Sequence, residues 1–224
     1  MPGRAVVVRL AEALEVPLRE RNALLLSAGY APAYEETSFD DPKLGPIRTA
    51  LERILEGHLP YPAVITDRQG DLVSGNHAFW ALTEGVAPAL LAPPVNVARL
   101  LLHPQGMAPR IVNLDEWGWH VIDALRERTV RNPNDRLQTL LTELQRFAPD
   151  RPREPRPDYR GIAVPLRLRS SDGELQLLTT LTHFGTAIDV TVAELTLEAF
   201  LPADDATESI LARLAGSWEP TRPG

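Results

Sequence analysis

Residues 62–85 read Pro62-Ala-Val-Ile-Thr-Asp-Arg-Gln-Gly-Asp-Leu-Val-Ser-Gly-Asn-His-Ala-Phe-Trp-Ala-Leu-Thr-Glu-Gly85. The apolar run at 63–66 predicts a short β-strand. Residues 67–70 begin with Asp and end with Gly, which favours a tight turn into a second strand at 72–73. Asn76 is a good N-cap for a following helix, because its side chain can accept a hydrogen bond from the helix backbone. The stretch therefore predicts two strands followed by a capped helix.

This order of elements resembles the opening of a PAS domain. The positions that match the PAS pattern are Asp67, Gly70, Asn76, Ala78, Leu82 and Gly85. PAS domains wrap a five-stranded antiparallel sheet around a pocket, so the resemblance implies an α+β fold with an interior binding site. Any β-hairpin packed on a helix has the same local pattern, and that alternative stays open at this point.

The composition narrows the class of protein. The chain has 224 residues, 44% of them hydrophobic, which is enough for a substantial core. The formal net charge of −7 argues against a chain whose main surface binds phosphate backbones. The absence of cysteine excludes disulfides, thiolate catalysis, cysteine metal sites and a flavin photosensor that forms a cysteinyl adduct. Without a transmembrane run or a secretory signal in the sequence, we expect a cytoplasmic protein.

Two short amphipathic helices are predicted at residues 4–16 and 17–28. The segment from Arg9 to Pro32 resembles the last two helices of a phage-repressor-type helix-turn-helix domain, as found in the bacterial MmyB-like transcription regulators. In that family the helix that reads DNA lies upstream, so the resemblance implies that DNA is bound only through a part missing from this chain. A plain helical hairpin is the alternative.

A second segment resembles the ligand-binding half of the same family. It runs from Ala92 to Asn113 and matches the family at Asn96, Arg99, His103, Pro104, Gly106 and Asn113. Asn113 is predicted to cap the next helix, and another helix is predicted from Pro133. The predicted organisation is a truncated helix-turn-helix remnant at 1–32, a linker with a connecting helix at 33–60, and a PAS-like domain at 61–216.

The C-terminal third switches to a period of two residues. Prolines at short intervals predict an exposed loop over 148–158, and alternation then predicts strands at 162–168 and 175–184. A last strand is predicted from 190 to 201, with a bulge at 193–194 to absorb a change of parity. The predicted fold class is therefore α+β: a PAS-like five-stranded antiparallel sheet with flanking helices, preceded by a short helical remnant of a helix-turn-helix domain.

Known catalytic patterns are missing from the sequence. It has no nucleophile elbow, phosphate-binding glycine loop, zinc-protease helix or dinucleotide fingerprint. The five histidines are scattered without the spacing of metal ligands. We therefore expect a protein that is not an enzyme and that holds no metal or cofactor, and an enzyme acting on acyl groups is kept as an alternative.

A binding role fits the family resemblance, which implies an apolar, fatty-acid-like molecule in the interior. A site of this kind needs an apolar cavity with a few polar groups. The candidate apolar wall consists of Ile65, Phe79, Trp80, Leu100, Met107 and Leu181, each of which also fits an ordinary core. His183, on the apolar face of a strand, fits a core histidine better than a haem ligand, and a haem sensor is a minor alternative.

Arg99 is the candidate partner for a ligand carboxylate, because it lies between apolar residues and a guanidinium binds a carboxylate bidentately. An internal ion pair with Asp115 or Glu116, or a bond to a loop carbonyl, explains the residue equally well. Asn96, His103 and Asn113 are the other polar candidates, and each also fits a role in holding a turn.

These observations predict the effector-sensing domain of a bacterial DNA-binding transcription regulator. The apolar faces of the helices at 4–28 and 46–57 exceed what one PAS-like core covers, so a homodimer is expected. A dimerisation domain that binds no ligand is the alternative from a different class.

Overall fold

The computed structural model describes residues 2–131, 133–150, 164–185 and 187–216. The strands are β1 (Ala63–Thr66), β2 (Leu72–Gly75), β3 (Leu166–Ser170), β4 (Gly173–His183) and β5 (Thr196–Pro202). The α-helices are α1 (Arg4–Ala13), α2 (Leu18–Ser27), α3 (Gly45–Gly57), α4 (His77–Leu82), α5 (Val97–Leu102), α6 (Leu114–Arg131), α7 (Asp135–Gln145), α8 (Val190–Ala193) and α9 (Asp205–Gly216). Short 3-10 helices occupy Pro42–Leu44, Pro88–Leu90 and Ala108–Arg110.

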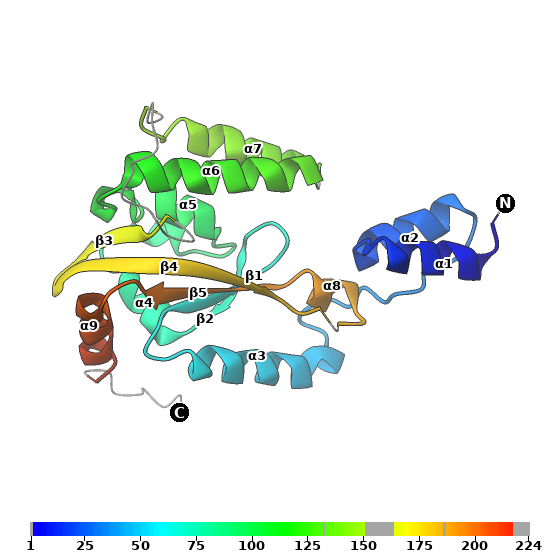
Figure 1. Ribbon diagram of the computed structural model, residues 1–224, viewed down its shortest axis with the longest axis horizontal. Coiled ribbons are helices and arrows are strands. Elements are labelled where there is room, and N and C mark those ends of the chain that lie inside the picture. Colours follow the sequence, from blue (N-terminus) through cyan, green and yellow to red (C-terminus); the bar gives the residue numbers. More distant parts are fainter. Residues whose placement is uncertain (1, 132, 151–163, 186, 217–224) are drawn as a thin grey trace.

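The strands form one antiparallel sheet in the order β2-β1-β5-β4-β3. β5 is the last strand in the sequence, yet it lies in the centre of the sheet between β1 and β4. Chain segments more than a hundred residues apart therefore meet on its two sides (Figure 1). The predicted α+β class and five-stranded antiparallel sheet are confirmed.

Helices cover both faces of this sheet, with α3 on one side and α6 and α7 on the other (Figure 1). Side chains of a strand alternate between faces, so β5 contributes to both layers. Leu197 and Ala199 pack with Leu51 and Leu55 of α3. Phe200 belongs to the larger core on the opposite face, together with residues of α4 to α7.

The first helix of the sheet domain is capped as the sequence predicts. Asn76 accepts a hydrogen bond from the Phe79 N–H (3.0 Å) and donates to the Tyr61 carbonyl (2.9 Å). The turn between β1 and β2 contains Gly70 at a φ of +79°, a conformation that other residues adopt only with strain.

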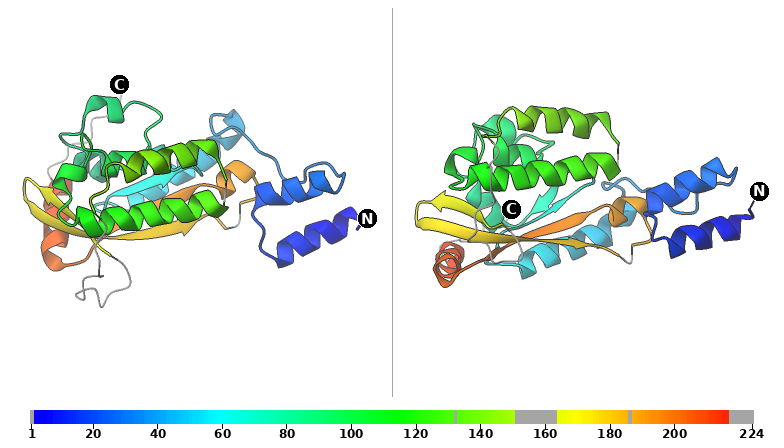
Figure 2. Two further views of the ribbon diagram at one scale, coloured as in Figure 1. Left: turned by 90° about the horizontal axis from the view of Figure 1, so that it is seen from above. Right: turned by 45° about the horizontal axis from the view of Figure 1, so that its top comes forward.

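The N-terminal hairpin of α1 and α2 projects beyond one end of the sheet, next to α8, while α9 lies at the opposite end (Figure 2). Within the described residues, no helix is long and apolar enough to span a membrane.

Two predicted strands differ from the structure. The segment predicted to begin the last strand forms α8 instead, because Asp189 accepts a hydrogen bond from the Thr191 N–H (2.9 Å) and so caps one helical turn. This turn takes the place of the predicted bulge at 193–194. The strand predicted at 162–168 is found at Leu166–Ser170. Residues 162–163, and 151–158 of the predicted exposed loop, lie outside the described residues.

Candidate functional site

A cavity of about 140 Å³ lies between α6 and the sheet. Its lining combines apolar residues with a few polar ones, as ligand sites in proteins do. The lining residues are Thr66, Gln69, Gly70, Asn96, Val97, Ala98, Leu101, Trp117, His120, Val121, Ala124, Leu125, Arg128, Leu140, Thr179, Leu181 and Glu198. They come from α5, α6, α7, three strands and the β1–β2 turn, so the cavity exists only in the folded domain.

The β1–β2 turn is fixed against the start of α5, and this contact builds one edge of the cavity. Asn96 donates hydrogen bonds to the Gln69 carbonyl (3.1 Å) and to Asp71 (3.0 Å), and it accepts one from the Arg99 N–H (3.2 Å). A side chain at Gly70 would bring a Cβ within 3.2 Å of the Arg128 guanidinium. Glycine at this position therefore lets Arg128 lie against the turn.

The apolar part of the lining is provided mainly by helices. Val97 and Leu101 of α5 are buried, as are Trp117 and Leu125 of α6. Leu140 of α7 closes the same region. Burying an apolar ligand against such side chains is favoured by about 25 cal/mol per Å² of surface removed from water.

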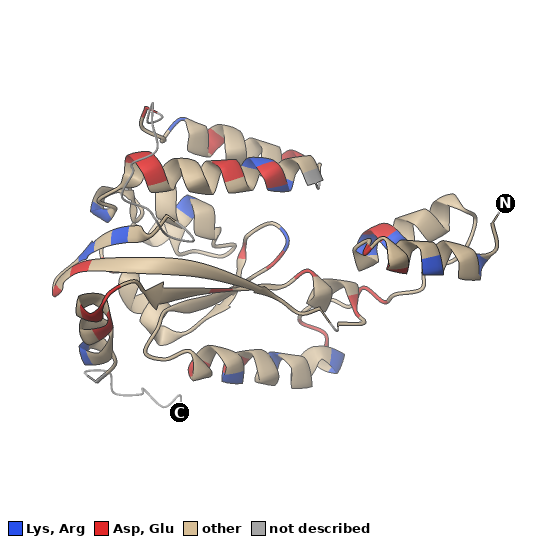
Figure 3. Cartoon of the chain, viewed as in Figure 1, with Lys and Arg blue, Asp and Glu red and all other residues tan. Residues whose placement is uncertain are grey.

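Glu198 is an acidic residue in the middle of the sheet, where charged residues are few (Figure 3). On β5 it faces Val64 of β1 on one side and Leu181 of β4 on the other. Burial raises the pKa of Glu198 to about 7, and the positive charge of Arg128 acts in the opposite direction. The residue is half-buried, and it borders the cavity.

Thr179 lies on the same face of β4, two residues from Leu181. Its hydroxyl is buried and has no hydrogen-bond partner in the structure. A buried hydroxyl without a partner destabilises a fold by roughly 1–3 kcal/mol, so a ligand atom that bonds to it would gain affinity.

Two of the eleven candidate residues named from the sequence line this cavity. They are Asn96, at its edge, and Leu181, on the sheet wall. Leu181 is 57% exposed although it faces α6, which shows that the cavity opens to solvent along β4. The nine other candidates lie elsewhere in the fold.

Arg99 is bound within the protein and does not line the cavity. Its guanidinium donates to both carboxylate oxygens of Glu143 on α7, from Nε (2.8 Å) and Nη2 (2.7 Å). This is the internal ion pair that the sequence left open, but its partner is neither Asp115 nor Glu116. The hydrogen bond from Arg99 also lowers the pKa of Glu143.

Asn113 and His103 hold loops in place. Asn113 is fully buried, and its side chain donates to the Pro165 carbonyl (2.9 Å) and accepts from the Arg167 N–H (3.0 Å). It precedes α6 as predicted, but these bonds of its side chain tie α6 to β3. His103 accepts from the Gln105 N–H (3.0 Å) and packs edge-on against Phe147.

The predicted apolar wall lies mostly in the packed core. Phe79, Leu100 and Met107 are almost fully buried in the core beneath α4 to α7. Ile65 points to the other face of the sheet, toward α3. Trp80 is 39% exposed and donates to the Gly75 carbonyl (3.2 Å).

His183 is exposed at the end of β4, beside Thr196 (Nδ1 to Oγ1, 3.3 Å). It borders a different hollow, between the start of α2 and α8. Among the described residues, no group of three or more His, Cys, Asp or Glu side chains is arranged to hold a metal ion.

Sequence reasoning missed Glu198, Thr179 and Arg128. The sequence held a signal for two of them. Thr179 interrupts the apolar face formed by Leu175, Leu177 and Leu181. Glu198 has the same parity along its strand as the core residue Phe200. A polar residue in register with buried ones marks either a solvated edge or a polar position in a cavity.

A comparison with models of protein families gives a match. The model of the family described as "MmyB-like transcription regulator ligand binding domain" matches residues 47–214. This range contains the whole sheet and every residue that lines the cavity. A search among curated proteins found no match. The chain belongs to the MmyB-like transcription regulators, and residues 47–214 are the ligand-binding domain of that family.

Proposed function

We propose that this chain senses an effector by binding a small apolar or fatty-acid-like molecule in the cavity beneath α6. The observation that supports this most is the composition of the cavity: an apolar lining with a few polar groups that have bonding capacity to spare. Its volume is close to the roughly 150 Å³ of an engineered apolar cavity that binds benzene. A ligand with a longer hydrocarbon chain would extend out of the cavity through its open side along β4.

Native mass spectrometry of the purified protein tests this proposal. We expect a small apolar molecule to be retained in the native protein and released on denaturation. Ala124→Phe places a ring into the cavity from α6 and is expected to abolish the retained mass. Ala212→Phe, at an exposed position of α9, is the matched control. Two results together would contradict the proposal. The native and denatured wild-type protein would have equal masses, and Ala124→Phe would have no effect on the binding of any ligand.

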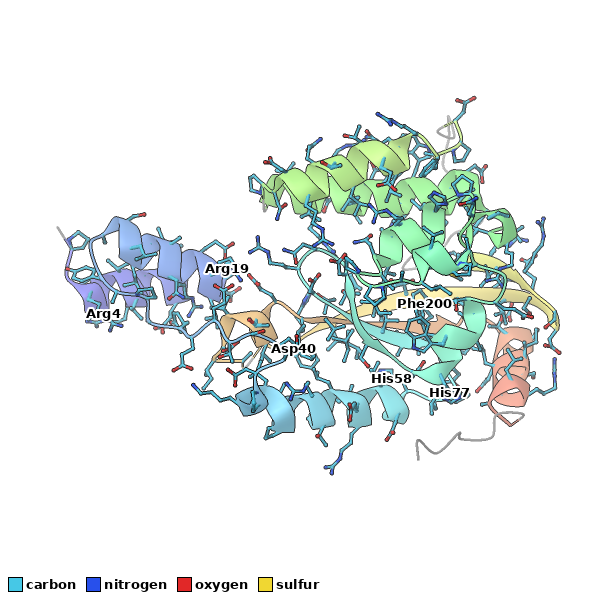
Figure 4. The ribbon with its side chains drawn as sticks, turned by 180° about the vertical axis from the view of Figure 1, so that it is seen from behind. Arg4, Arg19, Asp40, His58, His77 and Phe200 are labelled. Atoms are coloured by element: carbon cyan, nitrogen blue, oxygen red, sulfur yellow. The ribbon has the colours of Figure 1, made fainter. Side chains whose placement is uncertain are left out.

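Sensing also requires a connection from the cavity to the rest of the regulator, and α8 is well placed for it. Glu194, directly after α8, accepts from Arg19 of α2 through Nε (2.6 Å) and Nη2 (2.9 Å). Arg68 of the β1–β2 turn lies 3.6 Å from the same carboxylate. The next two residues of that turn, Gln69 and Gly70, line the cavity. Figure 4 shows Arg19 on the side of the N-terminal hairpin nearest to α8.

We also propose that the N-terminal hairpin mediates homodimerisation. The apolar face of α3 is used within the domain, since Leu51 and Leu55 pack against the sheet. The hairpin instead leaves apolar side chains in solvent, namely Val6, Leu10, Leu14, Leu24 and Leu26. Light scattering at tens of micromolar is expected to give the mass of a dimer for the wild type and of a monomer for Leu10→Glu. A monomeric wild type would contradict this.

A further inference from the structure

The sheet wall of the cavity carries two polar groups that neighbour each other across a strand pair. Leu181 of β4 lies directly opposite Glu198 of β5, and Thr179 lies opposite Phe200. Thr179 and Glu198 are therefore diagonal neighbours on one face, with Cα atoms about 7–8 Å apart in such a pair. A single small group between their side chains can reach both.

Both groups have hydrogen-bonding capacity that the protein leaves unused. The Thr179 hydroxyl is buried without a partner. The Glu198 carboxyl makes no hydrogen bond or ion pair with any residue in the described part of the chain, and Arg128 acts on it only through its charge. A hydroxyl can donate and accept, whereas an ionised carboxylate only accepts. The pair therefore lacks one group that donates to Glu198 and accepts from Thr179.

The charges around the cavity favour a neutral group. Arg128 is the one arginine or lysine among the described lining residues, and His120 and Glu198 are the titratable ones besides it. An ammonium head group is attracted by Glu198 but repelled by Arg128, and a carboxylate is attracted by Arg128 but repelled by Glu198, so neither ion gains from both charges. A hydroxyl adds no charge and leaves the attraction between Arg128 and Glu198 intact.

We propose that the cavity selects small apolar molecules that carry a hydroxyl head group, which donates to Glu198 and accepts from Thr179. This inference rests on the proposed function and narrows the ligand class to alcohols. The apolar body of the ligand would pack on Val97, Leu101 and Trp117, which line the opposite walls.

Four six-carbon probes that differ in the polar group test the inference: 1-hexanol, methyl pentyl ether, hexylamine and hexanoate. Calorimetric titration of the wild type at pH 8 is expected to show 1-hexanol binding about tenfold more tightly than the ether, which cannot donate. Thr179→Val and Glu198→Gln are each expected to reduce this preference about threefold or more. Thr180→Val, on the opposite face of β4, is the matched control and is expected to keep it.

The pH dependence gives a second readout. An alcohol binds best to ionised Glu198, whose pKa is raised to about 7 by burial, so the affinity for 1-hexanol rises between pH 6 and 8. Any binding of hexanoate is expected to fall over the same range, because the anion requires a protonated Glu198. Glu198→Gln should remove both trends, and His120→Gln should keep them.

Equal affinity of 1-hexanol and the ether would overturn the hydroxyl inference while leaving an apolar binding site in place. Tightest binding by hexanoate or hexylamine, without a change on Glu198→Gln, would overturn it as well. If none of the four probes binds and no molecule is released on denaturation, the proposed function itself fails.

Discussion

The face of the sheet beneath α6 has two ends that differ in packing although they share the same strands. At the closed end Leu166, Leu168, Leu175, Leu177 and Phe200 are buried in the main core. At the open end Thr66, Thr179, Leu181 and Glu198 border the cavity. One antiparallel ladder supports both ends. The comparison shows that a cavity needs no separate scaffold, because smaller or polar residues at a few positions of the same strands leave it open.

The largest expected effect separates the two ends by stability. Phe200 stacks on Phe79 at a centroid distance of 6.4 Å and lies inside the fold (Figure 4). Phe200→Ala is expected to lower the free energy of unfolding by about 3–5 kcal/mol, through lost burial and a new void. Leu181→Ala, at the open end, is expected to cost less than about 1 kcal/mol. Urea unfolding at pH 7 measures both, and equal losses would mean that the open end is packed in solution.

The next effect concerns Glu198 and pH. Burial raises its pKa from 4.5 to about 7, so the folded state binds a proton more tightly than the unfolded state. Stability is therefore lost as the pH rises from about 4.5 to 7, by up to about 3 kcal/mol. Glu198→Gln removes this loss and is expected to be more stable than the wild type by up to that amount at pH 8.5, with little difference at pH 4.5. Urea unfolding at both pH values tests this.

Glu52→Gln is the control for that experiment, because Glu52 is exposed on α3. It is expected to change stability by less than about 0.5 kcal/mol at either pH. A Glu198→Gln protein that gains no stability at high pH would show that Glu198 is solvated, and that the open end is a surface groove.

The sequence predicted the scaffold better than the site. Alternation and turn residues identified β1, β2 and β4, because those signals are local. The segment Val190–Ala193 was mistaken for strand, since valines two residues apart fit both structures and only the Asp189 cap decides between them. Arg99 was chosen for its apolar neighbours, but its partner Glu143 lies 44 residues away, and local sequence does not show such pairing.

Arg99 provides a smaller effect that separates structure from binding. The ion pair with Glu143 is bidentate but about one third exposed on both sides, so solvent screens it. Arg99→Met is expected to lower the free energy of unfolding by about 1 kcal/mol at pH 7. Since Arg99 lowers the pKa of Glu143, this contribution is present at neutral pH and is lost as the pH falls through the lowered pKa.

Arg99→Met is also expected to leave the affinity for 1-hexanol and hexanoate unchanged, because the residue does not line the cavity. Titration of both probes checks this. A large loss of affinity for hexanoate alone would return Arg99 to the role of carboxylate partner and move the binding site toward α5 and α7.

The smallest expected effect links the open end of the sheet to the N-terminal hairpin. Glu194 bonds to Arg19 of α2 and lies near Arg68, whose neighbours in the turn border the cavity. Glu194→Gln removes the charge that attracts both arginines, and these side chains are partly exposed, so the loss is about 0.5 kcal/mol. Amides of α2 should then exchange hydrogen about twofold faster, while those of β4 and β5 stay unchanged. Glu12→Gln is the control, since the carboxylate of Glu12 is half exposed and 4.0 Å from Arg21.

If the connection through Glu194 carries the signal, 1-hexanol slows hydrogen exchange in α2 of the wild type and has no such effect in Glu194→Gln. Equal slowing in both proteins would mean that the cavity is coupled to the hairpin by a route that does not pass through Glu194.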